Sequence, residues 1–206
     1  MMNDKIDKIN FLDLESLDPC DVMSRTGCEF DPATRQYRVN IWGHSYCADL
    51  EKYEVRPCGT GLKTYHDYLY IFILHFLIKS KSLPPEGKWV SEKDIKGGAA
   101  FFRGPHTLPS EWISKRFGNN IKAFRDACEK LGGVPLTLAD AAFSFQITPA
   151  IPVAVLYWQG DEDFPCETKL LFDRSIELHL PLDIIFALAV EVCHGVIQSP
   201  LLFQSG

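Results

Sequence analysis

The sequence has no excess of positive charge and no long hydrophobic run. Its 206 residues carry 21 Lys and Arg against 27 Asp and Glu, for a net charge of −6. Nucleic acid and anionic lipid attract clustered basic side chains, so neither is an expected partner. The most apolar stretch, 68–78, falls well short of the roughly 20 residues that cross a bilayer. We therefore expect a globular protein with neither nucleic-acid nor membrane partners.

The cysteines show no metal-binding spacing. Seven cysteines stand at positions 20, 28, 47, 58, 128, 166 and 193, and none forms a Cys-x-x-Cys motif. No secretory segment is recognisable ahead of them, so we predict a reducing, cytoplasmic location. Most of these thiols are then small buried hydrophobes. Cys20 with Cys28, or Cys47 with Cys58, remain alternative pairs of soft metal ligands, although their spacing matches no zinc or iron–sulfur pattern.

The linear motifs of common enzymes are also missing. The chain contains no Gly-x-Ser-x-Gly, no His-Glu-x-x-His, no phosphate-binding loop and no dinucleotide fingerprint. These absences disfavour common hydrolases and nucleotide-dependent enzymes. A convergent catalytic triad stays open, because it leaves no trace in the linear sequence.

What the sequence does contain is a mixture of alternating and helical patterns. Residues 36–42 and 45–55 flank Gly43-His44 and are typical of a β-hairpin. Residues 68–79 are apolar on nearly every side, and Thr64-x-x-Asp67 ahead of them is a capping box. A second capping box spans Ser91 to Asp94, before a packed loop at 97–109. We predict further strands at 89–91, 140–147, 151–158 and 168–172, and further helices at 110–117, 120–131 and 181–197.

The order of these elements predicts the fold class. Hairpins and helices come in runs, which favours an α+β fold with a mainly antiparallel sheet over a doubly wound parallel one. Residues 1–34 are expected to form a helix and loop extension, and residues 35–206 one compact domain.

Three stretches carry a family resemblance: ILHFLIK at 73–79, GGAAFFRGPHTLP at 97–109, and IPVAVLYWQGDEDFP with LLFD and HLPLDI at 151–184. They resemble the prokaryotic domain of unknown function 3786, from about residue 35 onward. The family has no settled activity. Some members carry an iron–sulfur domain similar to that of corrinoid iron–sulfur proteins, and the family tends to occur in anaerobes. The resemblance implies cofactor or one-carbon metabolism by association only.

The main functional hypothesis is a pocket between the 97–109 loop and the strand–turn at 156–164. Gly104-Pro105 restrains His106, which can act as an axial ligand to cobalt or haem iron, or as a general base. A structural histidine, and an ion pair between Arg103 and the acidic turn, are the alternatives. The expected ligand is a small molecule or planar cofactor, with a corrinoid or other tetrapyrrole as the specific candidate. The expected ligand-binding residues are Trp89, Phe101, Phe102, Arg103, His106, Trp158, Asp161 and Asp163.

A rival hypothesis rests on carboxylates. Three consecutive acids after Gly160 cannot all be buried unpaired, so they form a turn at the end of a strand that we expect to be central. Hard cations such as Mg²⁺ or Ca²⁺ prefer oxygen ligands. The rival is a metal-dependent enzyme with His106 as base and, as metal ligands, Asp161, Glu162, Asp163 and Asp173. An exposed hairpin turn explains the same acids without a metal.

Two smaller expectations complete the sequence-based picture. His179, close in sequence to Asp173 and Asp183, predicts either an acid–imidazole pair or a turn set by the same residues. A third functional reading is an interaction module whose exposed aromatic side chains dock onto a redox or corrinoid protein.

Overall fold

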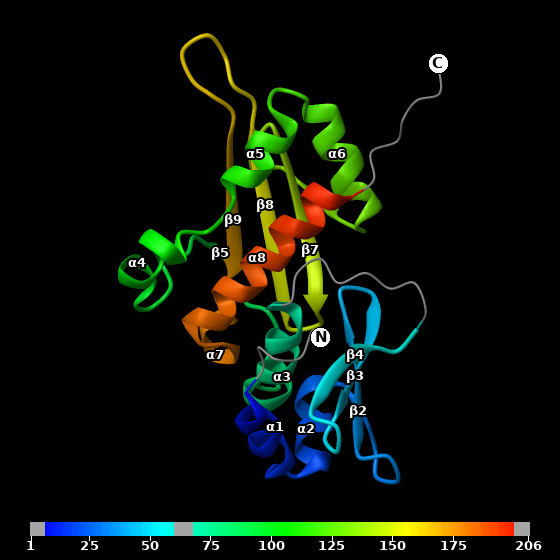
Figure 1. The fold of residues 1–206 in the computed structure, drawn as a ribbon. Coiled ribbons are helices and arrows are strands. Elements are labelled where there is room, and N and C mark those ends of the chain that lie inside the picture. The colour runs from blue at the N-terminus through cyan, green and yellow to red at the C-terminus, as the bar shows by residue number, and fades with distance from the viewer. Residues whose placement is uncertain (1–6, 60–67, 200–206) are drawn as a thin grey trace.

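Two antiparallel sheets and the helices packed on them make up residues 7–59 and 68–199, the part of the chain that this computed structural model describes (Figure 1). The predicted α+β class is confirmed. The first sheet has the order β1-β2-β3-β4 and the second the order β5-β9-β8-β7-β6. The strands are β1 Glu29–Asp31, β2 Gln36–Ile41, β3 His44–Asp49, β4 Glu54–Pro57, β5 Trp89–Val90, β6 Val134–Leu136, β7 Ala141–Thr148, β8 Ile151–Trp158 and β9 Glu167–Asp173.

The helices cover one face of the second sheet and one end of the molecule. α8 crosses that face, whereas α1, α2 and α3 lie beside the first sheet (Figure 1). The helices are α1 Lys8–Glu15, α2 Pro19–Thr26, α3 Tyr68–Lys79, α4 Gly98–Phe101, the 3-10 turn η1 Gly104–His106, α5 Glu111–Phe117, α6 Ile121–Lys130, α7 Ile176–His179 and α8 Leu182–Gln198. The helices predicted at 68–79, 110–117, 120–131 and 181–197 are confirmed to within about a residue at each end.

The predicted hairpin is present, but its second arm is two strands. β2 pairs with β3 around Trp42-Gly43, where both residues have positive φ, 48° and 75°. The strand predicted over 45–55 is interrupted at Leu50, since Asp49 Oδ1 accepts the N–H groups of Glu51 and Lys52 at 3.0 and 2.9 Å. This Asp turn reverses the chain, which returns as β4.

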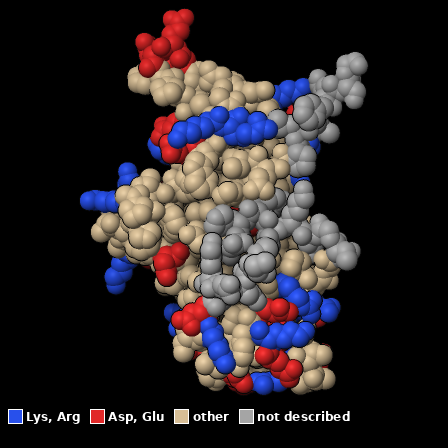
Figure 2. All heavy atoms as spheres, in the orientation of Figure 1, with Lys and Arg blue, Asp and Glu red and all other residues tan. Residues whose placement is uncertain are grey.

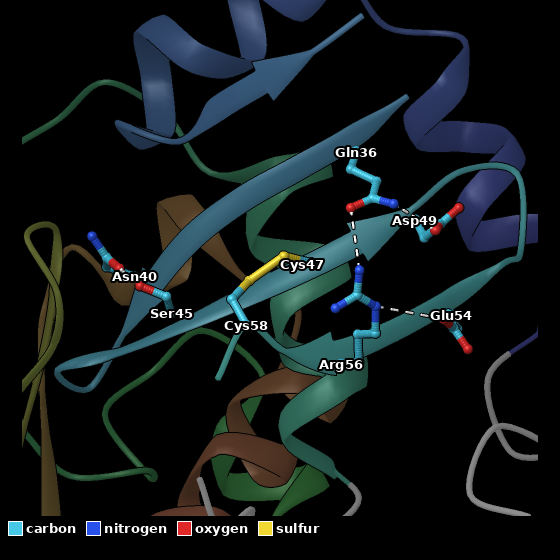
Figure 3. Close-up of a disulfide and its surroundings, with 8 residues drawn as sticks. All are labelled: Gln36, Asn40, Ser45, Cys47, Asp49, Glu54, Arg56 and Cys58. Carbon is cyan, nitrogen blue, oxygen red and sulfur yellow. Dashed lines mark hydrogen bonds and ion pairs between the residues drawn. A yellow bond between two sulfur atoms is a disulfide. The ribbon is translucent and has the colours of Figure 1, made fainter. Parts of the chain in front are cut away.

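A disulfide joins Cys47 of β3 to Cys58, the residue after β4 (Figure 3). The two Cα atoms are 5.8 Å apart, within the normal range for a disulfide. This corrects the reading of the pair as buried thiols or soft metal ligands. Closing a loop of 11 residues stabilises the β3–β4 hairpin by about 3 kcal/mol. Disulfides are rare in reducing compartments. The cytoplasmic location therefore stays a prediction, and the disulfide counts against it.

The second sheet has two different faces. β8 is the central strand, as predicted. Alternate residues of β8, such as Val155 and Tyr157, face the helices and join the main core, where α8 contributes Ile185, Leu188 and Val192. The intervening residues, such as Leu156 and Trp158, belong to a small separate cluster on the other face. Sequence alternation in β8 is hidden because both faces are apolar.

Helix α3 is buried as its composition predicts, with Phe72, Ile73, Leu74, Phe76 and Leu77 all in the core. Its predicted capping box at residues 64–67 lies outside the described residues. Over the described ranges, no helix has the length and apolar character needed to cross a membrane.

Phe11, Leu14 and Val22 of α1 and α2 belong to the same core cluster as residues of α3 and β9. The predicted boundary near residue 34 stays a prediction.

Glycine 98 fixes where the 97–109 segment begins. A Cβ at Gly98 would lie 1.9 Å from the backbone oxygen of Glu92, so only glycine fits this close approach. The predicted capping box at Ser91 does not start a helix. Instead the Ser91 N–H and Oγ both donate to the Asp94 carboxylate, at 3.1 and 2.7 Å, and form a turn. The segment therefore packs against residues 91–93 before α4 begins.

Candidate functional site: two pockets on either side of the 97–109 segment

The 97–109 segment separates two pockets instead of closing one. Phe102, Arg103, Gly104, Thr107 and Leu108 line a groove beside β9, which we call the β9 groove. The neighbouring Pro105 and His106 line a pocket against α3 and α8, which we call the His106 pocket. The predicted residues Arg103 and His106 thus lie in different sites.

The β9 groove has a cavity volume of about 760 Å³. Its floor is Thr168 and Leu170 of β9, both buried, and one wall is residues 91–93. The lining side chains carry three cations, Lys93, Arg103 and Lys169, against Glu92 and Glu167. Lys169 is paired with Glu167 at 3.0 Å. The charges left over are therefore two cations and one anion.

The His106 pocket is smaller and more aromatic, at about 530 Å³. The His106 ring stacks on Phe101, with centroids 4.5 Å apart and planes 17° apart, and makes a T-shaped contact with Phe186, with centroids 5.6 Å apart. η1 positions it, since the His106 N–H donates to the Arg103 carbonyl at 3.1 Å. Asp183 is the carboxylate in the wall. The full lining is Tyr68, Ile71, Pro105, His106, Trp112, Asp183, Ile184, Phe186, Ala187 and Val190.

The acidic turn lines neither pocket. It projects at the end of the β8–β9 hairpin, away from α4, and its acidic side chains form the tip of the molecule (Figures 1 and 2). Asp161 Oδ1 accepts the N–H groups of Asp163 and Phe164 at 2.9 and 2.8 Å, so the turn is self-contained. Among the ion pairs of the described residues, none joins Arg103 to this turn. The exposed-turn alternative therefore describes Asp161, Glu162 and Asp163.

The two predicted tryptophans belong to the opposite face of the sheet. Trp89 and Trp158 pack against Leu156 and its neighbours in the small outer cluster, whereas Phe101 and Phe102 pack on the main core. Trp158 also lies under the Lys169 ammonium, 5.3 Å from its ring centroid. The structure thus does not assemble the aromatic walls that we expected from Trp89, Phe101, Phe102 and Trp158.

Asp173 stands at the far end of β9 from the acidic turn. Asp173 lies six positions after Glu167 along β9, roughly 20 Å away at the usual rise per residue. Its carboxylate accepts the N–H groups of Glu86 and Gly87 at 2.9 and 2.8 Å, and the Ser175 hydroxyl at 2.7 Å. The four carboxylates predicted as metal ligands do not converge, and the described residues contain no His, Cys, Asp or Glu cluster of metal-binding size.

His179 is buried and bonds to neither predicted acid. Its Nδ1 lies 3.1 Å from Ser80 Oγ and accepts the Lys81 N–H at 3.3 Å. Burial, with the nearby Lys81 charge, lowers the pKa of His179 below its ordinary value, so the ring is neutral at neutral pH. His179 therefore ties α7 to the end of α3.

Sequence reasoning missed most of the His106 pocket. Asp183, Phe186, Ala187 and Val190 follow a helical stripe on α8, but that helix is apolar all round, so periodicity cannot mark a second face. The sequence offers one usable signal, since Trp112 is a large apolar residue on the short helix α5.

Comparison with known proteins gives one family match. Residues 18–194 match a family model described as "Domain of unknown function (DUF3786)". No curated protein and no solved structure matches the chain.

Proposed function

The chain belongs to the DUF3786 family, whose model covers residues 18–194, and from this premise we propose that it binds a planar aromatic molecule in the His106 pocket. The observation that carries the proposal is the placement of His106. Its ring is held between Phe101 and Phe186 at the wall of an aromatic-lined pocket of about 530 Å³. Ligand pockets typically have this size and this mixture of apolar walls with few polar groups.

The side chains of the pocket suit a flat ring system. Tyr68, Trp112 and Phe186 offer aromatic surfaces on which such a ring can stack, typically worth about 1 kcal/mol per ring pair beyond burial. His106 supplies a nitrogen ligand or hydrogen-bond partner, and Asp183 supplies a negative charge. A corrinoid or other tetrapyrrole is the specific candidate, because an imidazole can be an axial ligand to the cobalt of a corrinoid or to haem iron. The family's association with corrinoid proteins supports the same candidate only indirectly.

The test uses three probes: metal-free protoporphyrin, haemin and aquocobalamin. We expect at least one to bind, with a shift of its absorbance bands and a higher unfolding temperature, because a ligand that binds the folded state stabilises it. His106→Ala should weaken binding of haemin or aquocobalamin at least tenfold but change protoporphyrin binding little, since only a metal uses the imidazole. Trp112→Ala should weaken the binding of every probe that binds the wild type.

The control is His44→Ala, since His44 lies on β3, away from the pocket. It should leave binding unchanged. If none of the three probes produces a spectral or thermal shift, or if His44→Ala and His106→Ala have the same effect on the binding of haemin and aquocobalamin, the proposal fails. We also propose the cytoplasm as the compartment, which requires the Cys47–Cys58 disulfide to be reduced there. Thiol titration of freshly isolated protein tests this: free thiols at both positions would support the proposal, and an intact disulfide would contradict it.

A further inference from the structure

The edge of the second sheet is only partly paired. β5 covers β9 at two positions, where Trp89 faces Asp173 and Val90 faces Phe172. Between Glu167 and Leu171, the side of β9 that faces away from β8 has no strand beside it in the described residues. That side is the β9 groove. Exposed strand edges are templates for pairing with another chain, and proteins usually protect them.

Two hydrogen bonds identify which backbone groups face the groove. The Arg174 N–H donates to the Lys88 carbonyl at 2.9 Å, so the backbone of Arg174 points toward β5. Because backbone groups alternate along an antiparallel strand, those of Phe172, Leu170 and Thr168 point the same way. At the end of β8, the Gln159 N–H donates to the Asp140 carboxylate, on the side of the strand that faces β7. The backbone groups of Leu156 and Trp158 therefore face β9, where they pair with Lys169 and Glu167. The backbone groups of Thr168 and Leu170 then face away from β8, in agreement with the first hydrogen bond.

The groove therefore presents the N–H and C=O groups of Thr168 and Leu170 on the line that β5 begins. Thr168 and Leu170 are only 5% and 2% exposed as whole residues, so their outward backbone groups have little exposed area at the groove floor. The opposite wall is α4 and η1, and Glu92 and Lys93 close the side next to β5. A further strand fits this arrangement better than a compact ligand does, because a strand satisfies alternate backbone groups at one edge.

The charges of the groove indicate the chemistry of its partner. Lys93 and Arg103 are exposed, and neither takes part in an ion pair between described residues. They stand out on a chain whose net charge is −6. The chain's own acidic turn is an unsuitable occupant from a second copy, because Asp161 holds it in a tight turn.

We propose that the β9 groove binds an extended acidic segment of a partner protein, which adds a strand to the edge of β9. The backbone of Thr168 and Leu170 pairs with alternate residues of the segment, and Lys93 and Arg103 attract its carboxylates. This site is independent of the His106 pocket and does not depend on the planar ligand.

The probe is a labelled hexapeptide of alternating valine and glutamate, titrated by fluorescence anisotropy into the full chain. We expect saturable binding, at least tenfold weaker for the matching valine–lysine peptide. N-methylation at the three amides that face the edge should abolish binding, whereas N-methylation of the other three should leave it within a few-fold. Charge attraction alone cannot distinguish the two methylated peptides.

Arg103→Glu should weaken the binding of the valine–glutamate peptide at least tenfold. The control is Lys122→Glu on α6, which makes the same change of charge at an exposed site outside the groove and should not weaken binding. Both positions are exposed, so both variants should fold. The proposal is overturned if the two methylated peptides bind equally, if Arg103→Glu and Lys122→Glu behave alike, or if the valine–glutamate peptide does not bind at millimolar concentration.

Discussion

Asp173→Ala is expected to lower the free energy of unfolding by about 3 kcal/mol, with no metal present. Asp173 is only 2% exposed, and its carboxylate accepts hydrogen bonds from the turn before β5 and from Ser175. Truncation leaves these donors without their acceptor, and Ser175 is itself buried. Urea unfolding of the variant and the wild type measures the difference.

Asp161→Ala is the matched control, because the same type of residue was predicted to share a metal site with Asp173. Asp161 accepts two backbone N–H groups in an exposed turn, so its loss should cost less than about 1 kcal/mol. Equal losses of stability in the two variants would contradict the structural role of Asp173. A Mg²⁺-dependent stabilisation of the wild type that both variants lose would support the predicted metal site instead.

Asp173 also predicts a pH dependence. Burial raises the pKa of this carboxyl, but hydrogen bonds from Ser175, Glu86 and Gly87 outweigh it and hold the pKa below its ordinary value of 3.8. A depressed folded-state pKa means that the stabilisation is present above the unfolded-state pKa and is lost as the pH falls through the folded-state value. The wild type should therefore lose more stability than Asp173→Asn as the pH falls below about 4.

Gly98→Ala is expected to destabilise the protein by about 3 kcal/mol and to impair both binding sites. The added methyl would meet the Glu92 backbone oxygen at 1.9 Å, and a backbone atom cannot swing aside as a side-chain end can. Either residues 91–93 or α4 must shift. Both outcomes move walls of the β9 groove, and a shift of α4 also moves Phe101 away from His106.

The control for this variant is Ala100→Ser, a change of similar size at an exposed position of the same helix. It should alter stability by no more than about 0.5 kcal/mol. Thermal unfolding, together with peptide and porphyrin titrations, compares the two. If Gly98→Ala matches Ala100→Ser in stability and in both affinities, the close packing at Gly98 does not position the segment.

Local patterns in the sequence predict the elements well and their meeting points poorly. The apolar helix α3, the β7–β8 pair and the long helix α8 follow from composition and turn residues alone. The break after Leu50 depends on one Asp side chain that bonds the next backbone groups, and α4 and α7 are single turns too short for periodicity to detect.

The candidate site shows the same limit. Sequence reasoning identified the Arg103–His106 segment as important, and the structure places both residues in pockets. Sequence reasoning wrongly placed these two residues beside the acidic turn, because no local sequence pattern indicates toward which end of β9 the segment packs. That choice is set by the contact of Gly98 with Glu92 and by the two-residue pairing of β5 with β9.

The central claim is that the 97–109 segment separates two independent sites and that the acidic turn belongs to neither. Amide NMR of one sample, titrated first with metal-free protoporphyrin and then with the valine–glutamate peptide, tests it most directly. Protoporphyrin should shift the amides of His106, Trp112 and Phe186, and the peptide those of Arg103, Thr168 and Leu170, while residues 161–163 stay unchanged. Shifts of the same amides by both probes, or movement of the 161–163 amides by either, would contradict the account.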